Sequence, residues 1–304
     1  MATMTAATAL RQRKSAGAAR RRFADRLATV VLWSAAIGIV VALAFFIAYI
    51  FYLGWPAISW HFLTAPPSET DAGGGIGPEI FNSFYILFLT LIITTPIAMA
   101  GGIYLQEYAR PGTFTTVVQF CAESLATIPS IVMGLFGLIL FVNAFGWKFT
   151  AIGGALTLTL LNLPALMRVT QEALQNVPQS FREGSMALGA TKWQTIRRVV
   201  LPSAIPQLTT GIVLIAGRIF GETAALIYTA GVSVSAGKSA FDLNPFHTAE
   251  TLSVHLWYTH SESLVPDANA VGNGSALVLL AMVLAFNIFA RVVGRGLSRR
   301  LTGK

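Results

Sequence analysis

The chain has 304 residues, of which 54% are hydrophobic and only 11% are charged, and its formal net charge is +8. A soluble core does not need so large an apolar share, so the composition excludes an ordinary soluble domain and favours a membrane protein. A positive charge is also typical of nucleic-acid binding. Its distribution along this chain, however, follows membrane orientation, and nucleic-acid binding is not expected.

Residues 1–26 are basic and rich in Ala and Thr, and they lack the apolar core and cleavage site of a signal peptide. We predict a disordered cytoplasmic tail here, one six-span membrane domain over residues 27–295, and a cytoplasmic C-terminal tail over residues 296–304. Windows of about twenty apolar residues predict an all-α membrane protein. The six spans are predicted at Leu27–Leu53, Ile80–Leu105, Val117–Val142, Ala151–Met167, Ser203–Ala230 and Ser275–Val293.

The 21 Lys and Arg residues are unevenly placed along the chain. Eighteen of them lie in the N-terminal tail, between spans two and three, between Arg168 and Arg198, or from Arg291 onward. The loops on the other side hold only Lys148 and Lys238, together with all four His residues. Because cytoplasmic loops carry excess positive charge, both termini are predicted to be cytoplasmic.

Local features mark the third span. Pro129 is predicted to kink it, and Gly134 and Gly137 to allow close helix approach. The single Cys121 excludes an intrachain disulfide. Its apolar setting predicts a buried thiol rather than a redox or metal site.

A polar and basic loop at residues 177–202 separates two long apolar runs. Ser180 with Glu183, and Thr191 with Gln194, each have the capping-box spacing, which predicts two short helices. Gly189 lies between them, where a left-handed turn costs little.

The second short helix is expected to stop near Leu201, because Pro202 lacks an amide hydrogen and restricts the residue before it. Pro206 then fits only the first turn of a new helix. Such a cornered pair of helices between membrane spans is suited to contact with another protein. The alternative is an ordinary connecting loop that merely follows the positive-inside bias.

Arg218 and Glu222 lie in the predicted fifth span, four residues apart and therefore on one helix face. Two interpretations stay open, because intramembrane charge normally serves function but this pair is able to neutralise itself. If the cargo is an oxyanion, Arg218 offers a planar fork of donors. Glu222 would then accept a hydrogen bond from a protonated phosphate and repel sulfate. Arg168, at the cytoplasmic end of span four, is either a second anion contact or an interface anchor.

The loop at residues 231–274 carries histidines and acids that resemble a metal cluster in composition. Their spacing matches no usual ligand signature, so we expect a solvated docking face and no metal site. The residues are His247, His255 and His260 with Asp242, Glu250, Glu262 and Asp267.

Residues Gly237, Lys238 and Ser239 resemble the end of a phosphate-binding P-loop, but the glycine that this motif requires is replaced by Val232. We therefore predict that the chain is not an enzyme and that any ATP hydrolysis belongs to a separate motor chain.

The spacing of Glu183, Gly189, Leu201 and Pro202 is similar to the EAA loop of ABC-importer membrane subunits, with Gly184 and Ser185 in place of the two alanines. Four segments together resemble the A-type permease subunit of the phosphate-specific ABC importers. These are Gly102–Ala109, Ile128–Gly137, Arg182–Pro202 and Gly217–Leu226.

The resemblance implies a type I ABC-importer permease fold in the bacterial inner membrane, with a phosphate path and a cytoplasmic coupling helix. Its implied partners are a second, C-type permease, a cytoplasmic ATPase dimer that binds ATP and Mg, an extracytoplasmic phosphate-binding protein and membrane lipid, with no cofactor in this chain. The alternative is a permease for another oxyanion or small solute. The implied path residues are Arg218, Glu222, Thr223 and Arg168. The implied coupling residues are Glu183, Gly184, Ser185, Ala187, Leu188, Gly189, Ala190, Thr191, Leu201 and Pro202.

Overall fold

The computed structural model describes residues 2–68, 70–232, 241–263 and 265–302. These residues form helices and loops and contain no β-strand, which confirms the all-α prediction. The chain divides into two compact units, Met1–Leu53 and Gly54–Lys304. The P-loop-like residues Gly237, Lys238 and Ser239 lie outside the described part of the chain.

The first unit is one long helix, α1 (Ala2–Gly54). Its apolar part, within Asp25–Ala57, is long enough to cross a membrane. The helix α1 includes residues 2–26, where the sequence analysis expects a disordered tail. Ala and Arg are strong helix formers and no proline interrupts this segment, so the helix continues through it.

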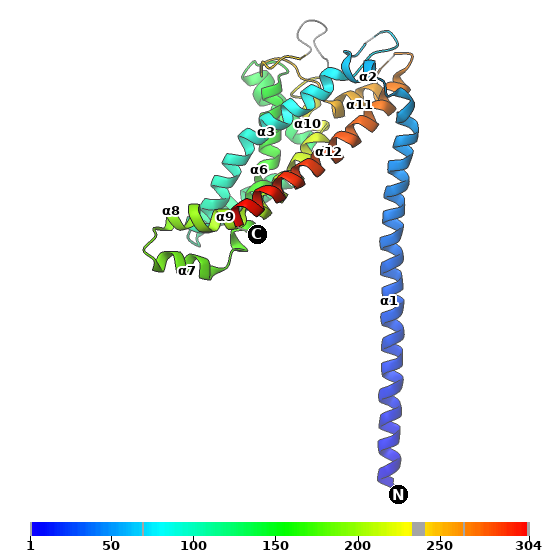
Figure 1. Cartoon of the computed structure of the whole chain (residues 1–304), viewed down its shortest axis with the longest axis vertical. Helices are drawn as coiled ribbons and strands as arrows, with labels where there is room; N and C mark the ends of the chain where they lie inside the picture. Colours follow the sequence, from blue (N-terminus) through cyan, green and yellow to red (C-terminus); the bar gives the residue numbers. More distant parts are fainter. Residues whose placement is uncertain (1, 69, 233–240, 264, 303–304) are drawn as a thin grey trace. The chain divides into compact units, whose positions relative to one another are not determined.

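The second unit contains the remaining helices (Figure 1). Short pieces come first, the 3₁₀ segment η1 (Trp55–Ala57) and α2 (Trp60–Thr64). The long helices α3 (Gly77–Ile103), α6 (Ala151–Gln175), α9 (Leu201–Phe220) and α12 (Ala268–Thr302) follow in chain order. Each forms or contributes to an apolar helix of membrane-spanning length, which agrees with four of the predicted spans.

The third predicted span is sharply bent. It consists of α4 (Thr113–Ala126), α5 (Ser130–Gly137) and the π-helical segment η3 (Leu138–Ala144), and the two halves meet at 101°. Pro129 caps α5 at this break, as its predicted role requires. A Cβ atom at Gly134 would lie 2.8 Å from the Cα of Ala225, so the close approach expected there is confirmed.

Cys121 is exposed on α4, although the sequence predicted a buried thiol. No residue of α4 is buried within this chain. The apolar setting of Cys121 is therefore a surface that this chain does not cover.

The fifth span differs from the prediction at both ends. The helix does not stop near Leu201, because α8 (Lys192–Thr195), the π-helical segment η4 (Ile196–Val200) and α9 run on as one helix, Lys192–Phe220. The wider π turn directly precedes Pro202, which lies in the first turn of α9. At the other end α9 stops at Phe220 and gives way, after Gly221, to the short helix α10 (Ala224–Ile227).

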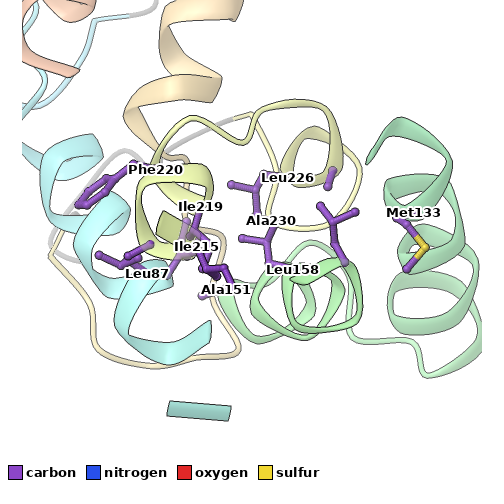
Figure 2. Packing of buried hydrophobic residues seen from close by; sticks show 14 of the residues in the cluster. Leu87, Met133, Ala151, Leu158, Ile215, Ile219, Phe220, Leu226 and Ala230 are labelled. Carbon is purple, nitrogen blue, oxygen red and sulfur yellow. The ribbon is translucent and has the colours of Figure 1, made fainter. Parts of the chain in front are cut away.

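A buried apolar core joins α3, α5, α6, α9 and α10 (Figure 2). Leu87 of α3 lies beside Phe220 and Ile219 of α9, while Leu158 of α6 lies beside Leu226 of α10. A ring of Phe84 meets Phe220 edge to face, with ring centroids 5.2 Å apart. This core fixes the break after α9 against the α3–α6 pair.

The elements outside the core gather at the two ends of the second unit (Figure 1). The helix α7 (Gln179–Ala187), with α8 and the π-helical segment η2 (Tyr104–Tyr108), marks one end, which we call the α7 end. The helix α11 (Leu252–Ser261), with α2, marks the opposite end, which we call the α11 end. The candidate site residues divide between the α7 end and the middle of the unit.

Candidate functional site

The corner at the α7 end is built from backbone hydrogen bonds around Gly189. The amide of Gly189 donates to the carbonyl of Met186 at 2.9 Å, and the amide of Ala190 donates to the carbonyl of Ser185 at 3.3 Å. These two bonds form a Schellman motif, and Gly189 takes the left-handed φ of +84° that the motif requires. The predicted role of Gly189 as the corner is confirmed.

The two predicted capping boxes have different outcomes. At α8 the box is complete, since Thr191 Oγ1 accepts from the amide of Gln194 and Gln194 Oε1 accepts from the amide of Thr191. At α7 the box from Ser180 to Glu183 is absent, because the helix starts two residues earlier and Pro178 occupies its N-cap. Proline fixes the backbone at this start without a side-chain acceptor.

Arg182 holds α7 to the rest of the unit, and sequence reasoning had not selected it. Its guanidinium contacts Glu107 Oε1 of η2 at 2.8 Å and donates to the carbonyls of Val177 and Leu174 at 2.7 and 2.8 Å. The two charged side chains are only 12% and 8% exposed. The guanidinium of Arg182 thus makes four hydrogen bonds, and a buried ion pair is favourable only when such additional hydrogen bonds satisfy its polar groups.

Further contacts tie α8 to the same place. Lys192 Nζ donates to the backbone carbonyl of Glu107 and lies 5.0 Å from the ring centroid of Tyr108. The hydroxyls of Ser185 and Thr195 hydrogen-bond at 2.9 Å and link α7 to α8. The cornered pair is therefore a braced unit at the end of α3 and η2.

The outward side of this corner is open to contact. Leu188 is 91% exposed, and the expected coupling residues Glu183, Gly184 and Ala187 are also exposed. Exposed apolar side chains that are grouped together typically mark a surface for contact with another molecule. The other exposed apolar side chains here are Phe181, Met186 and Trp193.

The remaining expected coupling residues lie further in. Ser185, Ala190, Leu201 and Pro202 are half-buried, and Thr191 is exposed at the N-cap of α8. Leu201 packs against a second apolar cluster, formed by the end of α6 and the start of α9. These residues support the corner, while its tip carries the exposed surface.

Arg218 and Glu222 do not share one helix face, because α9 ends between them. Arg218 lies exposed in the last turn of α9, and Glu222 follows the C-cap Gly221. Within the described residues no ion pair joins the two, so the self-neutralised arrangement weighed from the sequence is absent. The guanidinium of Arg218 is left available for another anion.

Hydrogen bonds from side-chain hydroxyls to backbone carbonyls hold the segment after α9 against the start of α11. Ser253 Oγ donates to the carbonyl of Glu222 at 2.9 Å, and Thr223 Oγ1 donates to the carbonyl of Ser253 at 3.4 Å. Both Glu222 and Thr223 are half-buried. The break in the span is consequently a fixed turn beside Arg218.

Arg168 lies on α6, whereas Arg218 lies on α9. It pairs with Glu172 at 3.3 Å on the exposed side of α6, and both residues line a cavity of about 580 Å³ between α6 and α4. Val169 contacts Gly211 of α9, and Gly211 lies two helical turns before Arg218 on the same stripe. Seven residues of α9, or about 10 Å along the helix, separate Gly211 from Arg218.

The histidine-bearing loop is only partly the solvated face that the sequence suggested. His247 pairs with Asp242, and His260 is exposed. His255 and Glu250, by contrast, are buried. Burial alone lowers the pKa of His255, but its hydrogen bond to Glu250 and the charges of Glu79 and Glu250 raise it, and the net shift is upward.

Comparison with known proteins shows the family to which the chain belongs. Residues 98–303 match the family described as "Binding-protein-dependent transport system inner membrane component". The probable ABC transporter permease protein YqgI of Bacillus subtilis is 43% identical over 290 residues, which cover 93% of this chain and 99% of that protein. The phosphate transport system permease protein PstA of Xylella fastidiosa (strain Temecula1) is 34% identical, covering 76% of this chain and 77% of PstA.

Among solved structures, a bacterial alginate ABC transporter in complex with an alginate pentasaccharide-bound periplasmic protein contains a similar chain. The TM-score is 0.67 at 17% identity, covering 90% of this chain and 96% of that one. The likeness concerns the fold, which is that of type I ABC-importer permeases.

The apolar helices of membrane-spanning length, the cornered pair α7 and α8 at one end, and the family match together identify a multi-span membrane permease. The chain belongs to the binding-protein-dependent transport family, and it is a permease subunit of an ABC importer.

Proposed function

We propose that this chain is the permease subunit of a phosphate importer. The observation that carries the proposal is Arg218, an exposed arginine with no ion-pair partner among the described residues, placed where a membrane helix breaks. A charge so placed in a span normally serves a substrate path. Its planar fork of donors fits the paired oxygens of an oxyanion. The likeness to PstA supports phosphate as that oxyanion.

Glu222 supplies the selectivity in this proposal. It follows Arg218 across the fixed turn, and Thr223 adds a hydroxyl. A carboxylate accepts a hydrogen bond from a protonated phosphate oxygen, whereas sulfate at neutral pH has no proton to donate and is repelled. Arg168, on α6, would act as a second contact on the path.

The corner formed by α7 and α8 would couple transport to a separate ATPase dimer, which binds ATP and Mg. Its exposed Leu188, beside Glu183 and Gly184, offers an apolar tip flanked by an acid. Arg182, Lys192 and neighbouring cations lie at the α7 end, which the positive-inside rule assigns to the cytoplasm. Both termini are then cytoplasmic in a bacterial inner membrane.

The other proposed partners are a second, C-type permease and an extracytoplasmic phosphate-binding protein. The exposed apolar surface of α4 suits the second permease or lipid. The competing proposal keeps this assembly with another oxyanion or small solute as cargo. It is favoured by the fact that an arginine fork also fits sulfate, and that YqgI is described only as a probable permease.

The test is phosphate uptake into vesicles that contain this chain and its partners, with ATP inside and sulfate as competitor. Arg218→Gln is compared with Arg291→Gln, an exposed arginine of α12. We expect ATP-dependent uptake that ignores sulfate, abolished in the first variant and kept in the second. Uptake blocked by sulfate would retain the importer and overturn the cargo. Failure of Arg218→Gln to assemble would assign that residue a packing role instead.

Docking of the ATPase has its own test. Glu183→Lys and Gly189→Pro are expected to let ATP hydrolysis continue without uptake while the chain stays in the membrane. Normal coupling in both variants would refute the docking role of the corner.

A further inference from the structure

Three ionisable side chains from separate segments meet at the α11 end. Glu79 lies in the first turn of α3, Glu250 precedes α11, and His255 lies in the first turn of α11. One ligand atom from each lies within 4.8 Å of the others. All three are buried, with 0%, 3% and 6% of their surfaces exposed.

The polar atoms of this cluster are incompletely satisfied. Among the described residues, neither carboxylate oxygen of Glu79 has a hydrogen-bond partner, and Nε2 of His255 has none. Nδ1 of His255 lies 3.3 Å from Oε1 of Glu250. A buried carboxylate costs several kcal/mol unless it takes up a proton or gains a positively charged partner, and the unpaired oxygens of Glu79 beside Glu250 and His255 are placed to accept such a partner.

The donor set indicates what that partner is. An imidazole nitrogen with two carboxylates is a mixed N and O set, which suits Zn²⁺ better than the all-oxygen shells of Mg²⁺ or Ca²⁺. Ligand atoms around tetrahedral zinc lie about 3.4 Å apart, so the cluster has to contract by at most about 1.4 Å, which side-chain torsions supply.

A route to the cluster exists from the surface. A cavity of about 350 Å³ is lined by Glu250 and His255 and by two further acids, Asp71 and Asp267. No Lys or Arg is among the described residues that line it. A passage lined by acids attracts cations and disfavours anions.

We propose that Glu79, Glu250 and His255 form a binding site for a divalent transition-metal cation of the Zn²⁺ type, with a fourth position open to water. The two carboxylates neutralise the charge of the ion. The ion in turn joins the start of α3 to the start of α11, across segments that are distant in the sequence. The site is independent of the transported cargo and lies at the opposite end of the unit from the ATPase-facing corner.

The test measures zinc binding directly in the full-length chain purified in detergent, by equilibrium dialysis with Zn²⁺ as the only added divalent cation. We expect one zinc per chain. Glu79→Gln and His255→Gln each remove a ligand and should weaken binding by roughly 100-fold or more. The matched control is Glu262→Gln, which removes an exposed carboxylate at the end of α11 and should leave binding unchanged.

A second readout separates loss of the site from loss of the fold. Zinc should raise the melting temperature of the wild type and of Glu262→Gln, but not that of a Glu79→Gln or His255→Gln protein that elutes as a folded species. If one of these two variants does not fold, the other decides. Absence of stoichiometric zinc in the wild type, its retention by both variants, or its displacement by excess Mg²⁺ would overturn the proposal.

Discussion

Arg182 and Glu107 form a nearly buried ion pair, with Nη2 and Oε1 2.8 Å apart, that joins α7 to the π-helical end of α3. The same guanidinium also holds two carbonyls of the preceding segment. Through this pair, a force on the corner reaches a membrane-spanning helix directly.

Removing one partner of this pair should loosen the corner. Arg182→Gln leaves Glu107 buried and unpaired, and breaking such a pair costs about 3–5 kcal/mol. We expect a lower melting temperature and less uptake per ATP hydrolysed, both measured in the assembled transporter. Arg197→Gln, which removes an exposed arginine of η4, serves as the control. Equal coupling in the two variants would show that the pair does not transmit motion.

The left-handed turn at Gly189 gives a prediction with an internal control. Gly189→Ala should destabilise the corner by about 1–2 kcal/mol, because an L side chain at positive φ is strained although space is available. Gly184→Ala also points into open space, but in helical backbone, and should stabilise α7 by about 0.5–1 kcal/mol. Thermal unfolding of the two variants should shift in opposite directions. Shifts of the same sign would contradict the assigned backbone strain.

Close packing between α5 and α10 predicts a strong effect at Gly134. A methyl group there meets backbone atoms of Ala225 at 2.8 Å, and backbone moves less readily than a side chain. Gly134→Ala should cost about 1–3 kcal/mol of stability. Gly101→Ala places its methyl 3.1 Å from the flexible Sδ of Met167, so a smaller loss is expected. Comparable losses in a melting experiment would argue against the tight contact.

Glu222 should control discrimination rather than transport itself. Glu222→Gln removes the charge that repels sulfate and retains a hydrogen-bonding carbonyl, so sulfate should become an effective competitor while phosphate uptake persists. The measurement is the sulfate concentration that halves phosphate uptake, compared with that of wild type. An unchanged value would remove Glu222 from the selectivity step.

Features that depend on neighbouring residues could be predicted from the sequence. The turn at Gly189, the capping box of Thr191 and the break at Pro129 follow from local backbone chemistry, which the sequence displays directly. The break of α9 after Phe220 could not, because hydropathy continues past it to Ala230 and only packing against α3 and α6 reveals the stop.

Contacts between segments that are distant in the sequence could not be predicted from it either. Nothing near Glu107 indicates that it pairs with Arg182, and nothing near Glu79 indicates that it meets His255. The acids and histidines of one loop were weighed as a group, yet the buried cluster draws its third member from the start of another helix. Only the folded arrangement brings these residues together.

The sharp bend between α4 and α5 has a topological consequence. The two halves meet at 101°, α4 begins shortly after η2 of the α7 end, and the residues after η3 donate hydrogen bonds from Thr150 and Ala151 to the carbonyls of Thr229 and His247. If both halves belong to one span, the described part of the chain has up to six candidate membrane-spanning segments by length and composition, Asp25–Ala57 included. An even number of crossings would return the chain to the compartment in which it began.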